Sequence, residues 1–190
     1  MVRGCLLLAV CLISGPMHIR LMAVDANRDG QVDRQTLARA IEIGGAWVAA
    51  PHLTLTSTRP DVVSENVVAW TTYDDAGRGR EIFVYTRSKL FRCAHGSSHD
   101  ASACLLVLAS VLVHESWHFE HGPSEDAAYG RQFVFLKMNR APEKQVAEVL
   151  KARREAVKRQ KEEIRAARKM AHEESTNASR RDEQVRSGTK

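Results

Sequence analysis

Residues 109–132 read Ala-Ser-Val-Leu-Val-His-Glu-Ser-Trp-His-Phe-Glu-His-Gly-Pro-Ser-Glu-Asp-Ala-Ala-Tyr-Gly-Arg-Gln and contain a His-Glu-x-x-His pattern at 114–118. An apolar run, residues 101–113, leads into this pattern and predicts one buried helix. On a helix, His114 and His118 lie on the same face about 5.4 Å apart along the axis, so both rings can reach one metal ion. The pattern therefore predicts that His114 and His118 bind zinc.

Glu115 directly follows the first histidine. It is rotated by about 100° around the helix and can reach a metal-bound water without binding the metal, so it is the expected general base. Two histidines and a glutamate at the end of an apolar helix would be costly to bury without partners. A bound metal removes that cost, which favours a metal site over a packed core.

A third ligand is expected because catalytic zinc usually has three protein ligands and a water. Residues 122–124, Gly-Pro-Ser, end the first helix and provide a serine that can cap a second one. In that second helix Glu125, Tyr129 and Gln132 share one face. We expect Glu125 to be the third ligand, with Asp126 as the alternative. Tyr129 and Gln132 are candidates to contact the reacting group or simply to pack.

Residues 105–136 resemble the zincin metallopeptidases, and among them small gluzincin-like members with a compact spacing to the third ligand. Carried over by position, the resemblance implies a zinc-dependent peptidase with ligands His114, His118 and Glu125 and with Glu115 as catalytic base. It also implies a zincin-like fold, in which a small sheet packs on the helix that carries the motif.

Two other ligand assignments stay open. Residues 126–130, Asp-Ala-Ala-Tyr-Gly, also resemble the D-x-x-Y-G motif of the aspzincins, which would make Asp126 the ligand and Tyr129 a donor to the transition state. His121 lies about 10.5 Å from His114 along a straight helix and is expected to face solvent. If His121 or a loop histidine were a fourth ligand, the zinc site would be closed and the domain would be a non-catalytic, zinc-stabilised binding module.

The N-terminal segment 1–23 has the layout of a secretory signal peptide. One positive charge at Arg3 precedes a short apolar run, residues 5–13, which is followed by Ser-Gly-Pro. The run is shorter than the ~20 residues of a membrane-spanning helix, so we expect no transmembrane span. The sequence thus predicts an exported protein, periplasmic or secreted.

The number and positions of the cysteines also favour export. Cys93 and Cys104 would remain after removal of the signal and are expected to form a disulfide in an oxidising compartment. The alternative is a second zinc site formed by these cysteines with His95 and His99, although the close Cys-x-x-Cys pairs of structural zinc sites are missing.

Residues 24–141 are expected to form one α+β domain with a small antiparallel sheet. Residues 25–33 match the first nine positions of an EF-hand calcium loop, but Thr36 occupies the place of the bidentate glutamate, so a polar turn before a helix at 35–45 is the simpler interpretation. Strands are predicted at 53–57, 67–73 and 81–86, the last two as a hairpin. An edge strand of this sheet could hold an extended peptide or protein substrate.

Residues 142–190 are a charged tail, predicted to be a solvated helix to about Met170 with a disordered end. The segment 151–190 has 13 Lys/Arg against 7 Asp/Glu, so it accounts for the net charge of +5. The remaining chain has mixed charges and no basic patch that would indicate specific nucleic-acid binding. An interaction protein that acts through this tail is the remaining alternative to a zinc hydrolase.

Overall fold

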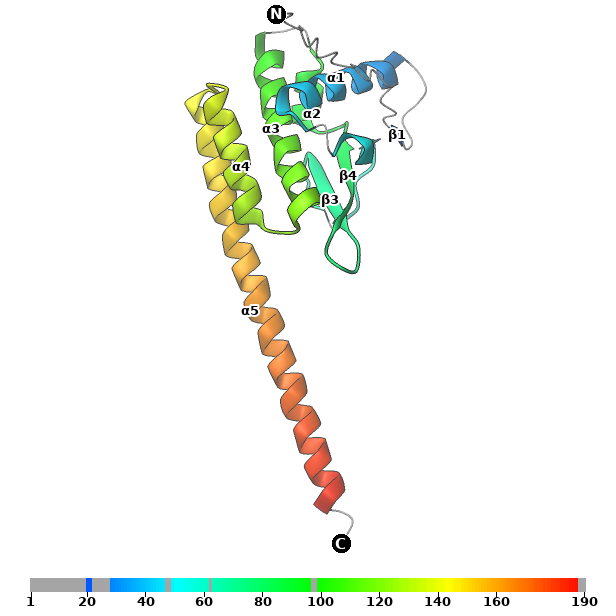
Figure 1. Ribbon diagram of the computed structural model, residues 1–190, viewed down its shortest axis with the longest axis vertical. Helices are drawn as coiled ribbons and strands as arrows, with labels where there is room; N and C mark the ends of the chain where they lie inside the picture. Colours follow the sequence, from blue (N-terminus) through cyan, green and yellow to red (C-terminus); the bar gives the residue numbers. More distant parts are fainter. Residues whose placement is uncertain (1–19, 22–27, 47–48, 62, 97–98, 188–190) are drawn as a thin grey trace, which may run out of the picture.

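The computed structural model describes residues 20–21, 28–46, 49–61, 63–96 and 99–187, and the chain belongs to the α+β class, as predicted (Figure 1). The elements in chain order are β1 (Arg20–Leu21), α1 (Arg28–Gly44), the 3-10 helix η1 (Ala50–His52), β2 (Leu53–Thr56), β3 (Ala69–Tyr73), β4 (Gly79–Tyr85), α2 (Lys89–Ala94), α3 (His99–His121), α4 (Glu125–Met138) and α5 (Glu143–Ser187). Apart from Arg20–Leu21, the predicted signal segment 1–23 lies outside the described residues.

The four strands form a mixed sheet in the order β1-β2-β4-β3, so the predicted antiparallel sheet is wrong. The predicted hairpin is confirmed, since β3 and β4 pair antiparallel. However, β2 pairs in parallel with β4, and β1 in parallel with β2. The connection 57–68 leads from β2 to β3, which lies at the far edge of the sheet. The next strand, β4, then fills the position between β2 and β3. In the described sheet β3 is therefore an edge strand.

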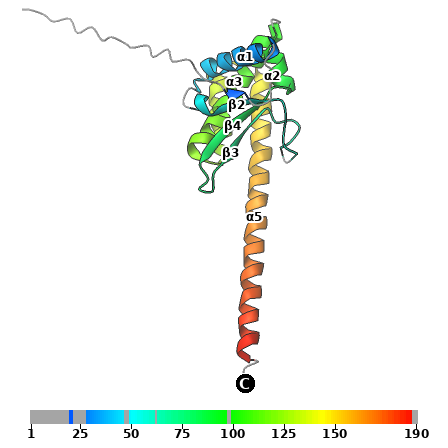
Figure 2. The ribbon, with the colours of Figure 1, turned by 90° about the vertical axis from the view of Figure 1, so that its right-hand side faces the viewer.

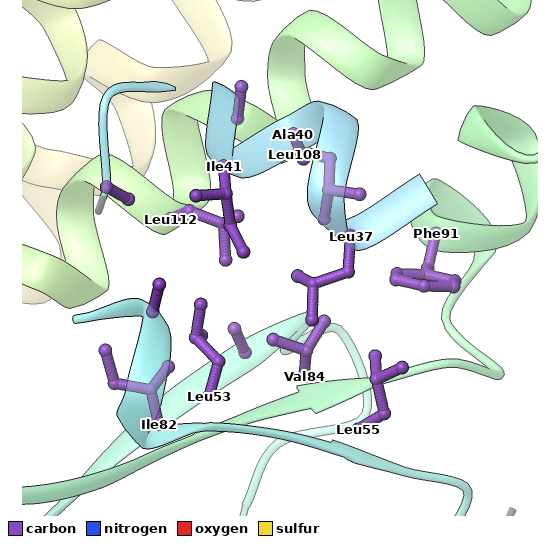
Figure 3. Close-up of a cluster of buried hydrophobic side chains, with 14 of the residues drawn as sticks. Leu37, Ala40, Ile41, Leu53, Leu55, Ile82, Val84, Phe91, Leu108 and Leu112 are labelled. Carbon is purple, nitrogen blue, oxygen red and sulfur yellow. The ribbon is translucent and has the colours of Figure 1, made fainter. Parts of the chain in front are cut away.

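The core lies between one face of this sheet and the helices α1, α2 and α3. Figure 3 shows the side chains that fill it, among them Leu37, Ile41, Leu53, Leu55, Ile82, Val84, Phe91, Leu108 and Leu112. Burial of a leucine or isoleucine of this kind contributes about 1.5–3 kcal/mol. The core thus fixes α3, which carries the histidine motif, against the sheet.

Helix α1 begins at Arg28, seven residues before the predicted start. Residues 28–33 are helical and do not have the loop conformation of an EF-hand, so the calcium-loop interpretation is wrong for this half of the segment; residues 22–27 lie outside the described part of the chain. Asp33, expected in a turn, instead lies with its Oδ1 2.6 Å from Nε2 of His95 at the end of α2. This contact and the burial of Leu37 hold the first turns of α1 in place.

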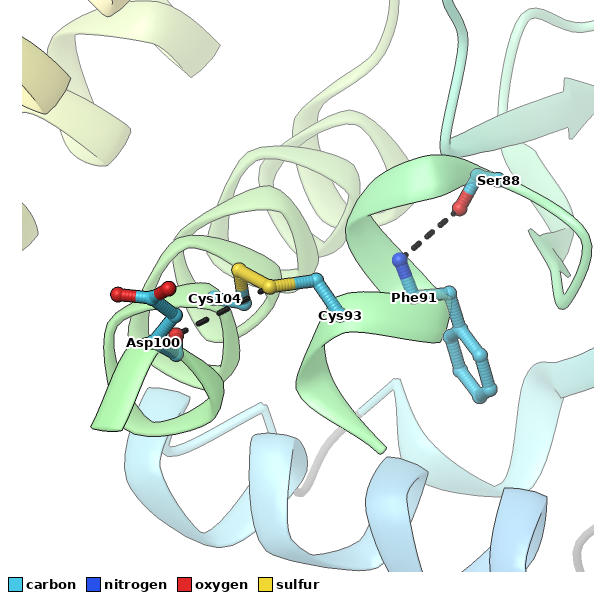
Figure 4. Close-up of a disulfide and its surroundings, with 5 residues drawn as sticks. All are labelled: Ser88, Phe91, Cys93, Asp100 and Cys104. Carbon is cyan, nitrogen blue, oxygen red and sulfur yellow. Dashed lines mark hydrogen bonds between the residues drawn. A yellow bond between two sulfur atoms is a disulfide. The ribbon is translucent and has the colours of Figure 1, made fainter. Parts of the chain in front are cut away.

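The predicted disulfide between Cys93 and Cys104 is confirmed (Figure 4). It joins α2 to the second turn of α3, with a Cα–Cα distance of 5.8 Å. Because both thiols are consumed in this bond, the alternative zinc site that uses both cysteines is excluded. The N-terminus of α2 is capped by Ser88, whose Oγ accepts a hydrogen bond from the Phe91 backbone N–H.

Helices α3 and α4 form an antiparallel hairpin, and α4 begins directly after the Gly-Pro-Ser turn, as predicted. Among the described residues, Asp100–His121 of α3 is the one segment that is long and apolar enough to cross a membrane. In the structure this helix packs against α1, the sheet and α4, and a central core helix passes the same test of length and composition.

Helix α5 continues to Ser187, well beyond the predicted end near Met170, so the prediction of a disordered end is wrong for the described part of the tail. The segment contains no glycine or proline before Gly188 and is rich in Ala, Glu, Lys and Arg, which favour helix even without tertiary contacts. The first turns are not solvated on all sides, because Val146 and Val149 pack with Leu136 of α4. The later turns project away from the domain (Figures 1 and 2).

Candidate metal centre and cleft

Three side chains, His114 and His118 from α3 and Glu125 from α4, converge near the turn that joins these two helices. The Nε2 atoms of His114 and His118 are 3.0 Å apart. Oε2 of Glu125 lies 3.6 Å from Nε2 of His114, and its Oε1 lies 3.5 Å from Nε2 of His118. The ligand atoms of the three residues all lie within 4.8 Å of one another, so the structure brings together the three predicted ligands.

The turn between the two helices makes this convergence possible. Gly122 has a φ of 90°, which lies in the left-handed region that favours glycine. Its carbonyl accepts a hydrogen bond of 3.0 Å from Nδ1 of His118. In a neutral ring this bond places the lone pair on Nε2, which faces His114 and Glu125, and zinc-binding histidines are oriented in the same way. Two imidazoles and a carboxylate are donors that zinc accepts, so these residues fit the metal.

The environment prepares these groups to bind a cation. Burial, helped by the neighbouring His118, lowers the pKa of His114 to about 4, so this ring is neutral and able to bind metal at neutral pH. Burial acts against ionisation of Glu125, but the contact with His118 and the positive charge that the two histidines carry at acidic pH outweigh it and lower the pKa of Glu125. The site thus offers the neutral imidazole of His114 and a carboxylate. Burial alone would lower the pKa of His118, but its contacts with Glu125 and the Gly122 carbonyl raise it, so a metal ion must displace a proton from this ring at lower pH.

The alternative ligand Asp126 is not part of this group. Its side chain is exposed and its Oδ1 accepts a hydrogen bond of 2.8 Å from Nε of Arg153 in α5. His121 is also outside the group and is exposed, as expected. Its ring stacks on Trp117, with 3.9 Å between the ring centroids. Among the described residues, no fourth His, Cys, Asp or Glu joins the three ligands.

Glu115 is buried beside the metal ligands and points to β3. Its Oε2 accepts a hydrogen bond of 2.7 Å from Oγ1 of Thr71. Burial raises the pKa of Glu115 to about 7, although the Thr71 hydroxyl partly offsets this effect. A carboxyl group with a pKa near neutrality can both take up and release a proton, which is the property needed of a general base that later acts as an acid.

Two tyrosines border the metal ligands, one predicted and one not. The ring of Tyr129 contacts the ring of His114 edge-on, with centroids 4.4 Å apart, and Tyr73 at the end of β3 lies 6.4 Å from the ring of His118. Burial raises the pKa of both phenols, so both remain protonated hydrogen-bond donors at neutral pH. Gln132, the other predicted candidate, is buried and donates a hydrogen bond to Ser110, so its amide has a structural partner.

A cleft of about 760 Å³ opens over the metal ligands. Its lining comes from α3, α4, β3 with the loop before it, and α5. One end is lined by apolar side chains, including Val67, Val107, Val111 and Val149, and the metal ligands lie toward the other end. The sequence did not indicate that the charged tail would form a wall of this cleft.

The β3–β4 hairpin approaches α3 closely at the site. A Cβ atom placed on Gly79 would fall inside contact distance of the Phe119 backbone, directly after His118, so only glycine permits this approach. The approach brings Thr71 and Tyr73 of β3 next to Glu115 and His118. Sequence reasoning did not find Thr71 or Tyr73, because nothing local connects a strand residue to a helix residue 44 positions away.

Comparison of the chain with protein-family models, with curated proteins and with solved structures finds no match.

Proposed function

We propose that the protein is a zinc-dependent hydrolase of the zincin type that cleaves peptide bonds. The observation that carries the proposal is the convergence of His114, His118 and Glu125 beside a buried carboxyl group, Glu115, at the floor of an open cleft. The lack of a fourth protein ligand among the described residues supports a catalytic site over a closed structural one, because catalytic zinc keeps one position free.

Zinc bound by His114, His118 and Glu125 would supply a Lewis acid that lowers the pKa of water and polarises a substrate carbonyl. The other steps belong to the chain. Glu115 takes up the proton of the attacking water and delivers it to the leaving amine. Tyr129 and Tyr73 are positioned near the histidine rings to donate hydrogen bonds to the oxygen on which negative charge develops.

The edge strand supports a peptide as the substrate. β3 borders the cleft through Ala69, Trp70, Thr71 and Tyr73 and, within the described sheet, pairs with β4 on one side only. A free strand edge binds an extended backbone through main-chain hydrogen bonds with little dependence on sequence. A peptide added to β3 would pass over the metal ligands. The Cys93–Cys104 disulfide supports the further proposal that the protein is exported to an oxidising compartment.

Zinc binding tests the ligand assignment. We expect Glu125→Gln to weaken the zinc affinity by more than the ~10–100-fold that is typical for loss of an outer partner of a ligand. Asp126→Asn is the matched control, since Asp126 is exposed and its pair with Arg153 is a surface ion pair of small energy. Competition titration with a zinc chelator measures both, and equal affinities of the two variants would reject Glu125 as the third ligand. Cleavage of a fluorogenic peptide library by the zinc-loaded protein tests the activity itself.

The Thr71 hydroxyl is expected to set the acidic limit of the activity. Its hydrogen bond lowers the pKa of Glu115, so Thr71→Val should raise this pKa, move the acidic limb of kcat/KM to higher pH and reduce kcat/KM on that limb by up to about tenfold. Thr71→Ser keeps the donor and should retain the wild-type profile. A pH–rate series on the three proteins makes the comparison. An unshifted limb in Thr71→Val would mean that Glu115 is not the titrating base.

A further inference from the structure

Helix α5 contributes one cation, Arg159, to the lining of the cleft that also contains His118 and Glu125. Arg159 is exposed and lines the cleft together with His118 and Glu125. Two contacts fix this part of α5 against the start of α4: the Arg153–Asp126 ion pair at 2.8 Å, and a hydrogen bond of 2.8 Å from Nε2 of Gln160 to the Pro123 carbonyl. The position of Arg159 is thus set by contacts on either side of it along the helix.

The guanidinium of Arg159 has no direct ion-pair partner among the described residues. Arg153 pairs with Asp126, and Lys158 lies 3.9 Å from Glu162, but Arg159 forms no direct ion pair with any described residue. In the cleft it acts electrostatically on Glu125, whose carboxylate it stabilises from a distance. When Glu125 binds a metal ion, its negative charge is neutralised by the metal. Arg159 would then be a positive charge in the cleft lining without an ion-pair partner among the described residues.

The cleft lining also contains a negative charge, Glu148, and the two charges together determine where an anionic group of a substrate would bind. Glu148 lies on the same helix at the apolar end of the cleft, eleven residues before Arg159, or about 16.5 Å along the axis. An anionic group of a substrate would be repelled from Glu148 and attracted to Arg159. Glu155, one turn before Arg159, is exposed and makes no ion pair with it among the described residues.

We propose that Arg159 binds a carboxylate of the substrate and so makes the enzyme selective for peptides with an acidic group near the scissile bond. The proposal rests on the proposed peptidase function. A guanidinium matches a carboxylate with two parallel hydrogen bonds, and arginine is always charged. The carboxylate can come from an Asp or Glu side chain or from the C-terminus of a short peptide, and the test below separates these sources.

The test uses the full-length, zinc-loaded protein and four versions of one peptide that the library shows to be cleaved. The peptide has Glu or Gln next to the scissile bond, and a free or amidated C-terminus. For wild type we expect kcat/KM to be about tenfold higher for one acidic version than for its neutral twin, and which twin shows the effect identifies the source. Arg159→Gln should lose this preference and Arg159→Glu should reverse it. Arg154→Gln, an exposed arginine of the same helix outside the cleft lining, should keep it.

Binding gives a second measurement that does not need turnover. The zinc-loaded Glu115→Gln protein should bind the preferred acidic peptide about tenfold more tightly than its neutral twin in fluorescence anisotropy, and addition of Arg159→Gln should remove the difference. Equal cleavage and equal binding of all four peptides would overturn carboxylate recognition and leave the peptidase intact. A preference that survives in Arg159→Gln would also overturn it. Absence of both cleavage and binding for every library peptide would overturn the proposed function and, with it, this proposal.

Discussion

Replacement of Glu115 by glutamine is expected to lower kcat/KM for peptide hydrolysis by about a thousandfold while zinc remains bound. The glutamine side chain has nearly the same shape and can still accept the hydrogen bond from Thr71, but its amide cannot take up a proton. The three proposed metal ligands are untouched by the change. Hydrolysis assays together with metal analysis of the same protein sample measure both quantities.

The matched control for this experiment is Glu120→Gln. Glu120 belongs to the same helix but is exposed, so its replacement removes the same charge without touching the cleft. Wild-type activity is expected for this variant. If Glu115→Gln retained zinc and the full hydrolytic rate, Glu115 would not be the general base.

The second large effect concerns the metal-free protein, in which Glu115→Gln is expected to be more stable than wild type at alkaline pH. Burial raises the pKa of Glu115 to about 7 from an ordinary value of 4.5, so the folded state prefers the protonated form. The stabilisation from this preference is fully present below pH 4.5 and is lost as the pH rises to 7. At pH 8 wild type must hold a buried carboxylate that the glutamine variant lacks, and the gain of the variant between pH 5 and pH 8 should be about 2 kcal/mol.

Urea unfolding of both proteins in the presence of a chelator, at pH 5 and pH 8, measures this difference. The pKa of His114, lowered to about 4, acts in the opposite direction, since its contribution is complete above pH 6.5 and is lost as the pH falls toward 4. It is common to both proteins and therefore cancels. Zinc should reduce the gap, because a nearby cation favours the charged form of Glu115. A gap independent of pH would show that Glu115 is not buried as described.

The sequence was informative where the interactions are local. The spacing of His114, His118 and Glu125 along one helical hairpin follows from helix periodicity and a Gly-Pro-Ser turn, so the candidate metal ligands could be named and the structure brings them together. Glu125 and Asp126 could not be separated in this way, because adjacent residues differ only by their rotation about the axis. In the structure Asp126 contacts Arg153 of α5 and lies outside the group, and this contact depends on how the tail packs on α4.

Interactions between distant segments could not be predicted. Thr54 and Thr56 alternate with leucines in β2, but all four residues of this strand are buried because it lies between β1 and β4 in the sheet. Thr71 and Arg159 reach the site only through the order of the strands and the packing of α5 on α4. The charge composition of the tail located the basic residues of the chain, but its average gave no sign that one of its arginines lies over the cleft.

Helix α5 also has a mechanical consequence. The last hydrogen bond described between this helix and the α3–α4 hairpin is made by Gln160, and the helix continues for another 27 residues to Ser187, which corresponds to about 40 Å. A continuous helix of this length resists bending far more than a flexible linker does. If the far end of the helix were attached to another structure, the helix would act as a spacer and hold the cleft at a nearly fixed distance from the attachment point. Only substrate chains that extend over this distance from that structure could then reach the cleft.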